Sequence, residues 1–331
     1  MSPPSTRGEQ RGAHFYLLAI TVGCAVKALT SLLNRMSRIR SAPDARVADS
    51  PSVWFASYSV LFAAQALAVA REVGRQRAGT ARPALRLALT PLEVGQLLLV
   101  AVVYTLMENL QFYVLEEVQA PVFQTFGNLK VLAAALFSRA LLGTRFKAHQ
   151  LFAMALLIVG SCLLRFSVMW VSTARIVATL VLILCSGFNL VLYEKLVCKP
   201  ALCVSVCNAT FYAASMLLHG ALALSTETGL VGNLVAFDTV TWLTVGAHVL
   251  NGTANTVLVV YAGAVGKQFI SQGAVVALAL IGVFSNSDTF VLTPGFALAS
   301  VLVFGGVWCW RFPPAFLEPA PRGAKGASKS E

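Results

Sequence analysis

The stretch from Tyr104 to Leu142 reads YTLMENLQFYVLEEVQAPVFQTFGNLKVLAAALFSRALL and decides the fold. It contains two apolar segments separated by a short acidic turn at 116–119, and each segment is about long enough to cross a hydrocarbon core of ~30 Å. Each also carries an ionisable residue deep inside, Glu108 in the first and Lys130 in the second. Because a charge at the centre of a spanning helix costs roughly 2.5–3.5 kcal/mol, such residues usually face a bundle interior or a water-filled cavity. The stretch therefore predicts a membrane protein in which Lys130 lines a path for an anion.

The composition of the whole chain agrees with this prediction. Of its 331 residues, 57% are hydrophobic and only 12% are charged, whereas a soluble domain carries about 25% charged residues. The excess of 25 Lys and Arg over 14 Asp and Glu could indicate a nucleic-acid-binding protein. These cations, however, cluster in loops between apolar spans, which the positive-inside rule explains better. The N-terminal apolar run from His14 to Leu33 is too long for the core of a cleavable signal peptide.

Hydropathy predicts an all-α membrane protein with ten transmembrane helices. We expect them near 14–34, 53–70, 92–115, 119–142, 148–168, 174–197, 202–223, 238–262, 266–286 and 289–311. A transporter domain at 14–311 then lies between polar tails at 1–13 and 312–331. Most Lys and Arg residues fall in loops on the side of both tails, which predicts that both termini are cytosolic. The basic cluster at 35–46 is the exception.

The two halves of the chain resemble each other. A shift of 146 residues without a gap superposes the third to fifth predicted helices on the eighth to tenth, and it aligns Asn109 with Asn255, Phe123 with Phe269, Gly127 with Gly273, and Gly160 with Gly306. This predicts two five-helix repeats, at about 14–168 and 174–311. Because five is odd, the second repeat enters the bilayer inverted. Inverted repeats are typical of transporters, which bind substrate at the repeat interface near the midplane.

Several polar residues share a helix face inside these spans. Tyr104 and Glu108 are four residues apart, as are Asn208 and Tyr212, while Gln124 lies beside the face that carries Lys130. One interpretation is a substrate site. The other is interhelical hydrogen bonding, worth about 0.6 kcal/mol per pair. Glu108 is also a candidate counter-ion for Lys130 in an empty site.

Three further groups of ionisable residues leave alternatives open. Lys267 begins a predicted span just after Gly263 and Gly266, so it either snorkels to the interface or joins a helix N-terminus in binding an anion. Lys27 is either a pore residue or a snorkelling one. The pair at 194–195 (Glu-Lys) closes the 174–197 span either as a solvated ion pair or with a role in the site.

The sequence does not favour an enzyme or a metalloprotein. Most of the seven cysteines fall within apolar spans, where cysteine is usually a small hydrophobe. Cys203 and Cys207 share a helix face, but no His or third Cys lies nearby with ligand spacing. No pairing of a nucleophile with a base is evident. We therefore expect no cofactor and no metal.

Three blocks of sequence resemble the nucleotide-sugar transporters of the drug/metabolite transporter superfamily, in the branch that carries CMP-sialic acid, UDP-galactose and UDP-N-acetylglucosamine. FQTFGNLK at 123–130 is similar to the family's YQ…LK segment, and SGFNLVLYEKL at 186–196 is similar to its SGF…YFEK block. VVYAGAVGKQF at 259–269 resembles the block VVKYADNIxKxF. The similarity covers most of residues 14–311.

The resemblance implies ten helices in two inverted repeats that exchange a cytosolic nucleotide sugar for a luminal nucleoside monophosphate in the Golgi membrane, the endoplasmic reticulum being the alternative. It implies lysines that meet phosphate and polar groups that hold the nucleoside, so the expected substrate-binding residues are Tyr104, Glu108, Gln124, Lys130, Ser186, Asn208, Tyr212 and Lys267. Phe123 replaces a family Tyr, and Glu108 replaces a family Asn. These departures leave open which sugar is carried and whether the nucleotide is UDP or CMP.

Two other functions are compatible with the sequence. One is the export of a different phosphorylated metabolite, such as a sugar phosphate. The other is a membrane receptor or scaffold without transport activity, although a receptor would more plausibly have seven spans and no internal repeat. The expected partners are the lipid bilayer, the nucleotide sugar and the nucleoside monophosphate, with a homo-oligomer left open and nucleic acid excluded.

Overall fold

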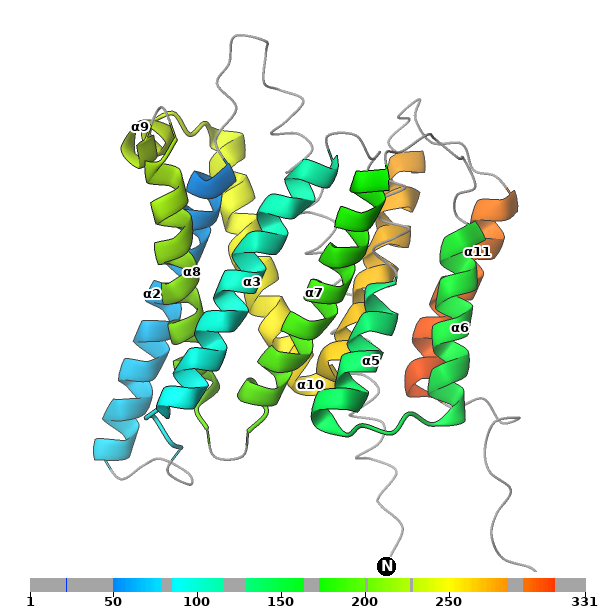
Figure 1. Ribbon diagram of the computed structural model, residues 1–331, viewed down its shortest axis with the longest axis horizontal. Coiled ribbons are helices and arrows are strands. Elements are labelled where there is room, and N and C mark those ends of the chain that lie inside the picture. Colours follow the sequence, from blue (N-terminus) through cyan, green and yellow to red (C-terminus); the bar gives the residue numbers. More distant parts are fainter. Residues whose placement is uncertain are drawn as a thin grey trace, which may run out of the picture.

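The computed structural model describes residue 22 and residues 50–78, 85–115, 129–163, 173–199, 202–226, 229–284 and 294–312. Within these ranges all named elements are helices, which run side by side (Figure 1). They are α2 (Ser50–Arg77), α3 (Pro91–Leu115), α5 (Lys130–Leu142), α6 (Ala148–Leu163), α7 (Thr173–Val197), α8 (Val204–Leu224), the short α9 (Gly229–Val235), α10 (Thr239–Phe284) and α11 (Pro294–Arg311). The all-α prediction is therefore confirmed for this part of the chain.

Among the described residues, five helical stretches are long and apolar enough to cross a membrane. They are Pro51–Arg77, Pro91–Gln111, Ile176–Val197, Val204–Leu224 and Thr239–Ser271. Four of them correspond to single predicted spans, and Thr239–Ser271 covers the predicted span 238–262 and the start of the one at 266–286, because continuous hydropathy over lipid length is the strongest signal in the sequence. Large apolar side chains such as Leu106 and Leu217 are exposed on their outer faces, as expected of helices whose solvent is lipid.

The other predicted spans are described in part. Apart from residue 22, the predicted first span at 14–34 lies outside the described residues. Of the predicted span at 119–142, the structure describes Leu129 and the helix from Lys130 onward, so Lys130 stands at the start of α5. Apolar helices at Ala148–Gly160 and Val301–Trp310 are shorter than a full span within the described residues.

A sharp bend divides α10 at Gly263. The backbone there has φ +73° and ψ 173°, a conformation that glycine adopts at little cost and other residues avoid. In Figure 1 the arm before the bend descends in yellow and the arm after it rises in orange. The bend coincides with the boundary expected between the predicted spans 238–262 and 266–286, which was indicated by glycines in an otherwise apolar run.

Two apolar cores hold the helices together. One lies among α2, α3, α7 and α8 and contains Leu97, Leu196 and Phe211. The other lies among α5, α6, α10 and α11 and contains Leu157, Phe269 and Val303. Helices α7 and α10 contribute residues to both cores, so they connect the two groups of helices.

The contact between α6 and α11 is reciprocal. A Cβ atom added to Gly160 would lie 2.9 Å from Leu302 Cβ, 3.0 Å from the Ala299 oxygen and 3.1 Å from Val303 Cγ2. One added to Gly306 would lie 2.9 Å from the Ala153 oxygen, 3.3 Å from the Leu157 nitrogen and 3.5 Å from Leu156 Cβ. The 146-residue shift that aligns the two glycines also carries 153, 156 and 157 onto 299, 302 and 303. Gly160 of α6 therefore packs on α11 in the same way that Gly306 of α11 packs on α6, which is the relation that a two-fold axis between the two helices requires.

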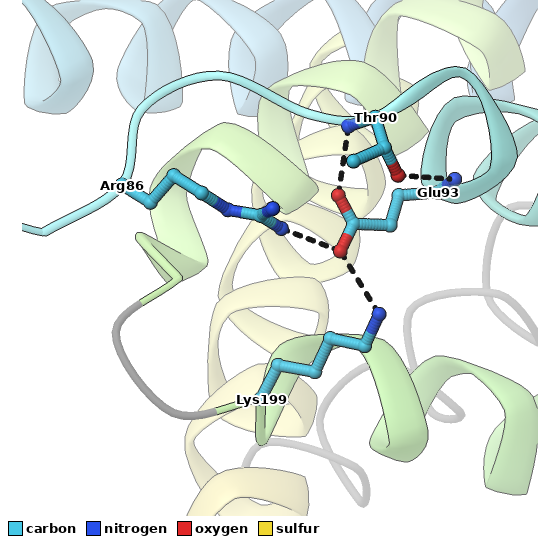
Figure 2. A network of polar contacts seen from close by, with 4 residues as sticks. All are labelled: Arg86, Thr90, Glu93 and Lys199. Atoms are coloured by element: carbon cyan, nitrogen blue, oxygen red, sulfur yellow. Dashed lines mark hydrogen bonds and ion pairs between the residues drawn. The ribbon is translucent and has the colours of Figure 1, made fainter.

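A cluster of charged groups, which we call the Glu93 clasp, joins the start of α3 to the end of α7 (Figure 2). Thr90, Pro91 and Glu93 form a capping box with proline in the first turn: the Thr90 N–H donates to Glu93 Oε2 at 2.8 Å and the Glu93 N–H donates to Thr90 Oγ1 at 3.3 Å. Glu93 Oε1 accepts from Arg86 at 2.5 Å and from Lys199 at 2.9 Å. A backbone bond from the Cys203 N–H to the Arg86 carbonyl lies beside it.

Candidate functional site

A cavity lies between helices α2, α3, α7, α8 and α10. Its volume of about 110 Å³ is room for several water molecules. Four of the eight residues expected to bind substrate line it: Tyr104, Ser186, Tyr212 and Lys267. The other lining residues are Trp54, Ser57, Tyr58, Leu61, Val100, Met107, Asn189, Leu190, Tyr193, Phe211, His248, Asn251, Gly252, Asn255, Thr256, Val259 and Gln268. The cavity thus combines aromatic rings, side-chain amides and one lysine.

Aromatic side chains from three helices form a wall of this cavity. The Tyr104 ring meets the Phe211 ring edge-on with centroids 5.9 Å apart, and Phe211 lies 5.2 Å from Tyr212. The Tyr58 ring lies 6.0 Å from the Tyr212 ring. Such rings offer flat faces on which a planar group can stack. At another part of the lining, Trp54 and His248 pack with centroids 4.2 Å apart.

A hydrogen-bond network ties three helices together beside this wall. The Tyr193 hydroxyl on α7 donates to Asn208 Oδ1 on α8 and lies 3.1 Å from Thr256 Oγ1 on α10. The Tyr212 hydroxyl lies 3.4 Å from both Thr256 Oγ1 and the Gly252 carbonyl oxygen. Asn208 itself is buried and does not line the cavity. The expected pair Asn208 and Tyr212 is thus connected through Tyr193 and Thr256.

Sequence reasoning missed several lining residues, and for some a signal was present. His248, Asn251, Asn255 and Thr256 recur at helical spacing on α10, which is the pattern of one polar face in a lipid-length helix. Tyr193 follows Ser186 by seven residues and shares its face on α7. Nothing in the sequence of α2 marks Tyr58 or Trp54 as facing a cavity, because apolar residues lie around them on every face of the helix.

Glu108 lies behind the cavity and is not among its lining residues. Tyr58, which does line it, donates to Glu108 Oε1 at 3.2 Å, and Glu108 Oε2 lies 2.9 Å from His219 Nε2. His219 Nδ1 lies 2.8 Å from the Ser215 carbonyl, to which it must donate. The contacts of Glu108 therefore come from α2 and α8, whereas the sequence suggested Lys130 on the neighbouring predicted span.

Lys267 lines the cavity one turn after the bend in α10. At the bend itself, Glu194 Oε2 accepts a hydrogen bond of 3.0 Å from the Ala264 N–H. The carboxylate thus sits at the start of the second arm of α10, a position that favours negative charge. Glu194 is in this respect a link between α7 and α10, rather than one half of a solvated pair with Lys195.

The last two expected site residues lie elsewhere. Lys130 is half-buried at the first turn of α5 and is not among the lining residues of the cavity. Gln124 lies outside the described residues. Close by, Gly187 on α7 approaches α5 so tightly that an added Cβ would lie 2.6 Å from Ala133 Cβ. This glycine lets α5, which carries Lys130, pack directly against α7, which carries Ser186.

Comparisons with known proteins give a consistent picture. A family model described as nucleotide-sugar transporter matches residues 12–311. The UDP-N-acetylglucosamine transporter of Mus musculus is 25% identical over 242 residues, covering 68% of this chain and 73% of that protein. The UDP-galactose/UDP-N-acetylglucosamine transporter srf-3 of Caenorhabditis elegans is 25% identical over 291 residues, or 83% and 78% of the two chains.

Two further matches extend this set. The CMP-sialic acid transporter 2 of Oryza sativa subsp. indica is 26% identical over 217 residues, covering 63% of this chain and 60% of that protein. One crystal structure shares the fold with a TM-score of 0.57 at 17% sequence identity, covering 88% of this chain and 98% of the other.

Proposed function

Because the chain belongs to the nucleotide-sugar transporter family, we propose that it exchanges a cytosolic pyrimidine nucleotide sugar for a luminal nucleoside monophosphate. The cargo is a UDP-sugar, such as UDP-galactose or UDP-N-acetylglucosamine, or CMP-sialic acid, in line with the names of the relatives. The chain is a membrane transporter and not an enzyme, so its work is to expose one site to each side of the membrane in turn.

The observation that carries this proposal is the convergence of the expected residues on one cavity. Tyr104, Ser186, Tyr212 and Lys267 come from four different helices, α3, α7, α8 and α10, yet all line the same space. Lys267 supplies a positive charge for phosphate, and as an ammonium it acts as a point charge. The aromatic wall and the Tyr193 network supply a platform and polar groups for a nucleoside.

We further propose ten helices in two inverted five-helix repeats, with both termini cytosolic and the protein in the Golgi membrane. The reciprocal packing of Gly160 and Gly306 supports the two-fold relation between repeats, since residues related by the 146-residue shift make the same contacts. Epitope tags at the two ends should be protease-sensitive in intact Golgi vesicles. Protection of either tag would overturn this orientation.

The proposed exchange requires the loaded carrier to reorient faster than the empty one. Lys267 lines the cavity, so this cation is positioned to meet the phosphate of either substrate. We therefore expect internal nucleotide to accelerate uptake.

The test uses purified protein in liposomes preloaded with UMP, CMP, GMP or buffer, supplied externally with a panel of radiolabelled nucleotide sugars. We expect UMP or CMP inside to accelerate uptake of one sugar nucleotide and GMP to have no effect. Lys267→Gln should weaken uptake and reduce the ratio of exchange to uptake into empty liposomes. Lys147→Gln, at an exposed position between α5 and α6, is the matched control and should behave as wild type. Equal uptake into empty and preloaded liposomes would refute obligatory exchange, and uptake only of a sugar phosphate would identify a different cargo.

A further inference from the structure

Asn189 stands out among the cavity residues. It lies on α7 between Ser186 and Tyr193 and lines the cavity, yet the residue is only 3% exposed. Its carboxamide oxygen Oδ1 is buried and has no hydrogen-bond partner among the residues that the structure describes. Buried polar atoms are nearly always hydrogen-bonded, so an orphaned acceptor calls for a specific explanation.

A structural role does not explain this side chain. An asparagine that stabilised the helix bundle would bond across to a neighbouring helix, as Tyr193 does to Asn208 one turn further along α7. Asparagine also has a lower helix propensity than the alanine or leucine that would fill the same space. Because Asn189 lines the cavity, a ligand seated there can bring the donor that this buried acceptor lacks.

We propose that Asn189 reads the nucleobase of the cargo, with Oδ1 accepting a hydrogen bond from an N–H on the pairing edge of the pyrimidine. This inference rests on the proposed function and deepens it. The carboxamide presents an acceptor beside a donor. Uracil offers N3–H beside O4, and cytosine offers the N4 amino group beside N3, so either base pairs with the amide in one of its two orientations.

The surroundings of Asn189 favour the base over the other parts of a nucleotide sugar. A phosphate offers acceptors, which do not satisfy an orphaned acceptor. The Tyr193 ring, on the same face of α7, lies 5.8 Å from Phe211, and Phe211 belongs to the aromatic wall with Tyr104 and Tyr212. Proteins that read single bases combine an aromatic stacking surface with hydrogen bonds to the pairing edge, and both are present here.

The experiment compares the affinity of the protein for ordinary nucleotides with its affinity for nucleotides that are methylated on the pairing edge of the base. Purified protein is titrated with UMP, N3-methyl-UMP, CMP and N4,N4-dimethyl-CMP, and binding is read from inhibition of exchange and from thermal stabilisation. For the preferred nucleotide, wild type should bind the unmodified form about 10–100-fold more tightly than the methylated one, since a lost partner leaves a buried acceptor unsatisfied. In Asn189→Ala the affinities for the unmodified and the methylated nucleotide should differ by no more than about twofold.

The control is Asn109→Ala, which removes the same group from an exposed position on α3 where its amide donates to the Thr105 carbonyl. It should retain the wild-type ratio. If Asn189→Ala does not fold, Asn189→Leu preserves the volume and should show the same loss of discrimination. A ratio that survives both substitutions overturns the assignment. So does a variant that binds UMP and CMP normally and loses affinity only for the nucleotide sugar, because the contact would then be to the sugar. Absence of nucleotide binding in wild type would instead refute the proposed function.

Discussion

The packing of α6 on α11 allows a quantitative test of the close approach at Gly160 and Gly306. A methyl group added at Gly160 would meet Leu302 Cβ at 2.9 Å and the Ala299 oxygen at 3.0 Å, whereas carbon atoms in contact lie about 3.5–4.0 Å apart. Since one of these atoms belongs to the backbone, relief requires the helices to separate by a few tenths of an ångström. Overpacking of this kind costs about 1–3 kcal/mol.

The reciprocal geometry makes the prediction sharper. Gly306→Ala would place its methyl group 2.9 Å from the Ala153 oxygen, so it should destabilise the protein about as much as Gly160→Ala. A single outward shift of α11 relieves both clashes. The double variant should therefore cost less than the sum of the two single variants, by at least about 0.5 kcal/mol.

Thermal unfolding in detergent, followed by tryptophan fluorescence, measures these effects. Domains of 150–250 residues lose roughly 2–4 °C of Tm per kcal/mol, so each single variant should melt several degrees below wild type. Gly305→Ala is the matched control, because nothing lies within 4 Å of its added methyl group. It should melt at or slightly above wild type, since alanine is the better helix former. Wild-type melting of both Gly160→Ala and Gly306→Ala would refute the close approach, and strict additivity would refute the shared shift.

Three other substitutions test the site and the Glu93 clasp. Lys130 does not line the cavity, but the family resemblance implies that it meets phosphate, so Lys130→Ala should abolish nucleotide-sugar uptake while the protein still reaches its membrane; uptake near the wild-type level would contradict this role. Tyr193→Phe deprives buried Asn208 of a donor and should cost about 1–3 kcal/mol, measured as a lower Tm; an unchanged Tm would contradict the network. Glu93→Gln should lower Tm and make it less sensitive to salt, because the ion pairs it removes are partly exposed and screened; an unchanged salt dependence would show that the clasp contributes no electrostatic stabilisation.

Hydropathy predicted the long apolar helices that the structure describes, because a bilayer demands some 20 apolar residues in each span. The bend at Gly263 was predicted as a boundary by the same signal. Spacing on one helix face marked Tyr212 and the family resemblance marked Lys267, and both line the cavity, while their role in binding substrate stays a prediction. The predictions were best where the residues of a single helix were enough to make them, without knowledge of the neighbouring helices.

Contacts between helices were not predictable in the same way. Periodicity marks the face of a helix only when its other side is polar, and helices surrounded by lipid and protein are apolar on all sides. The partner of Glu108 is His219 on α8, although nothing in either helix specifies the rotation that brings them together. Asn189 escaped notice for the same reason, because its significance depends on a cavity to which five helices contribute.

The Glu93 clasp has a mechanical consequence for a carrier that changes shape. Glu93 belongs to the first half of the chain and Lys199 to the second, and the Arg86 backbone joins Cys203 beside them. A motion that pulls these two loops apart must rupture the ion pair between Lys199 and Glu93 together with the backbone hydrogen bond from Cys203 to Arg86. While the clasp stays closed, the start of α3, the end of α7 and the start of α8 are held to one another at this face, so these three helix ends can change position only together.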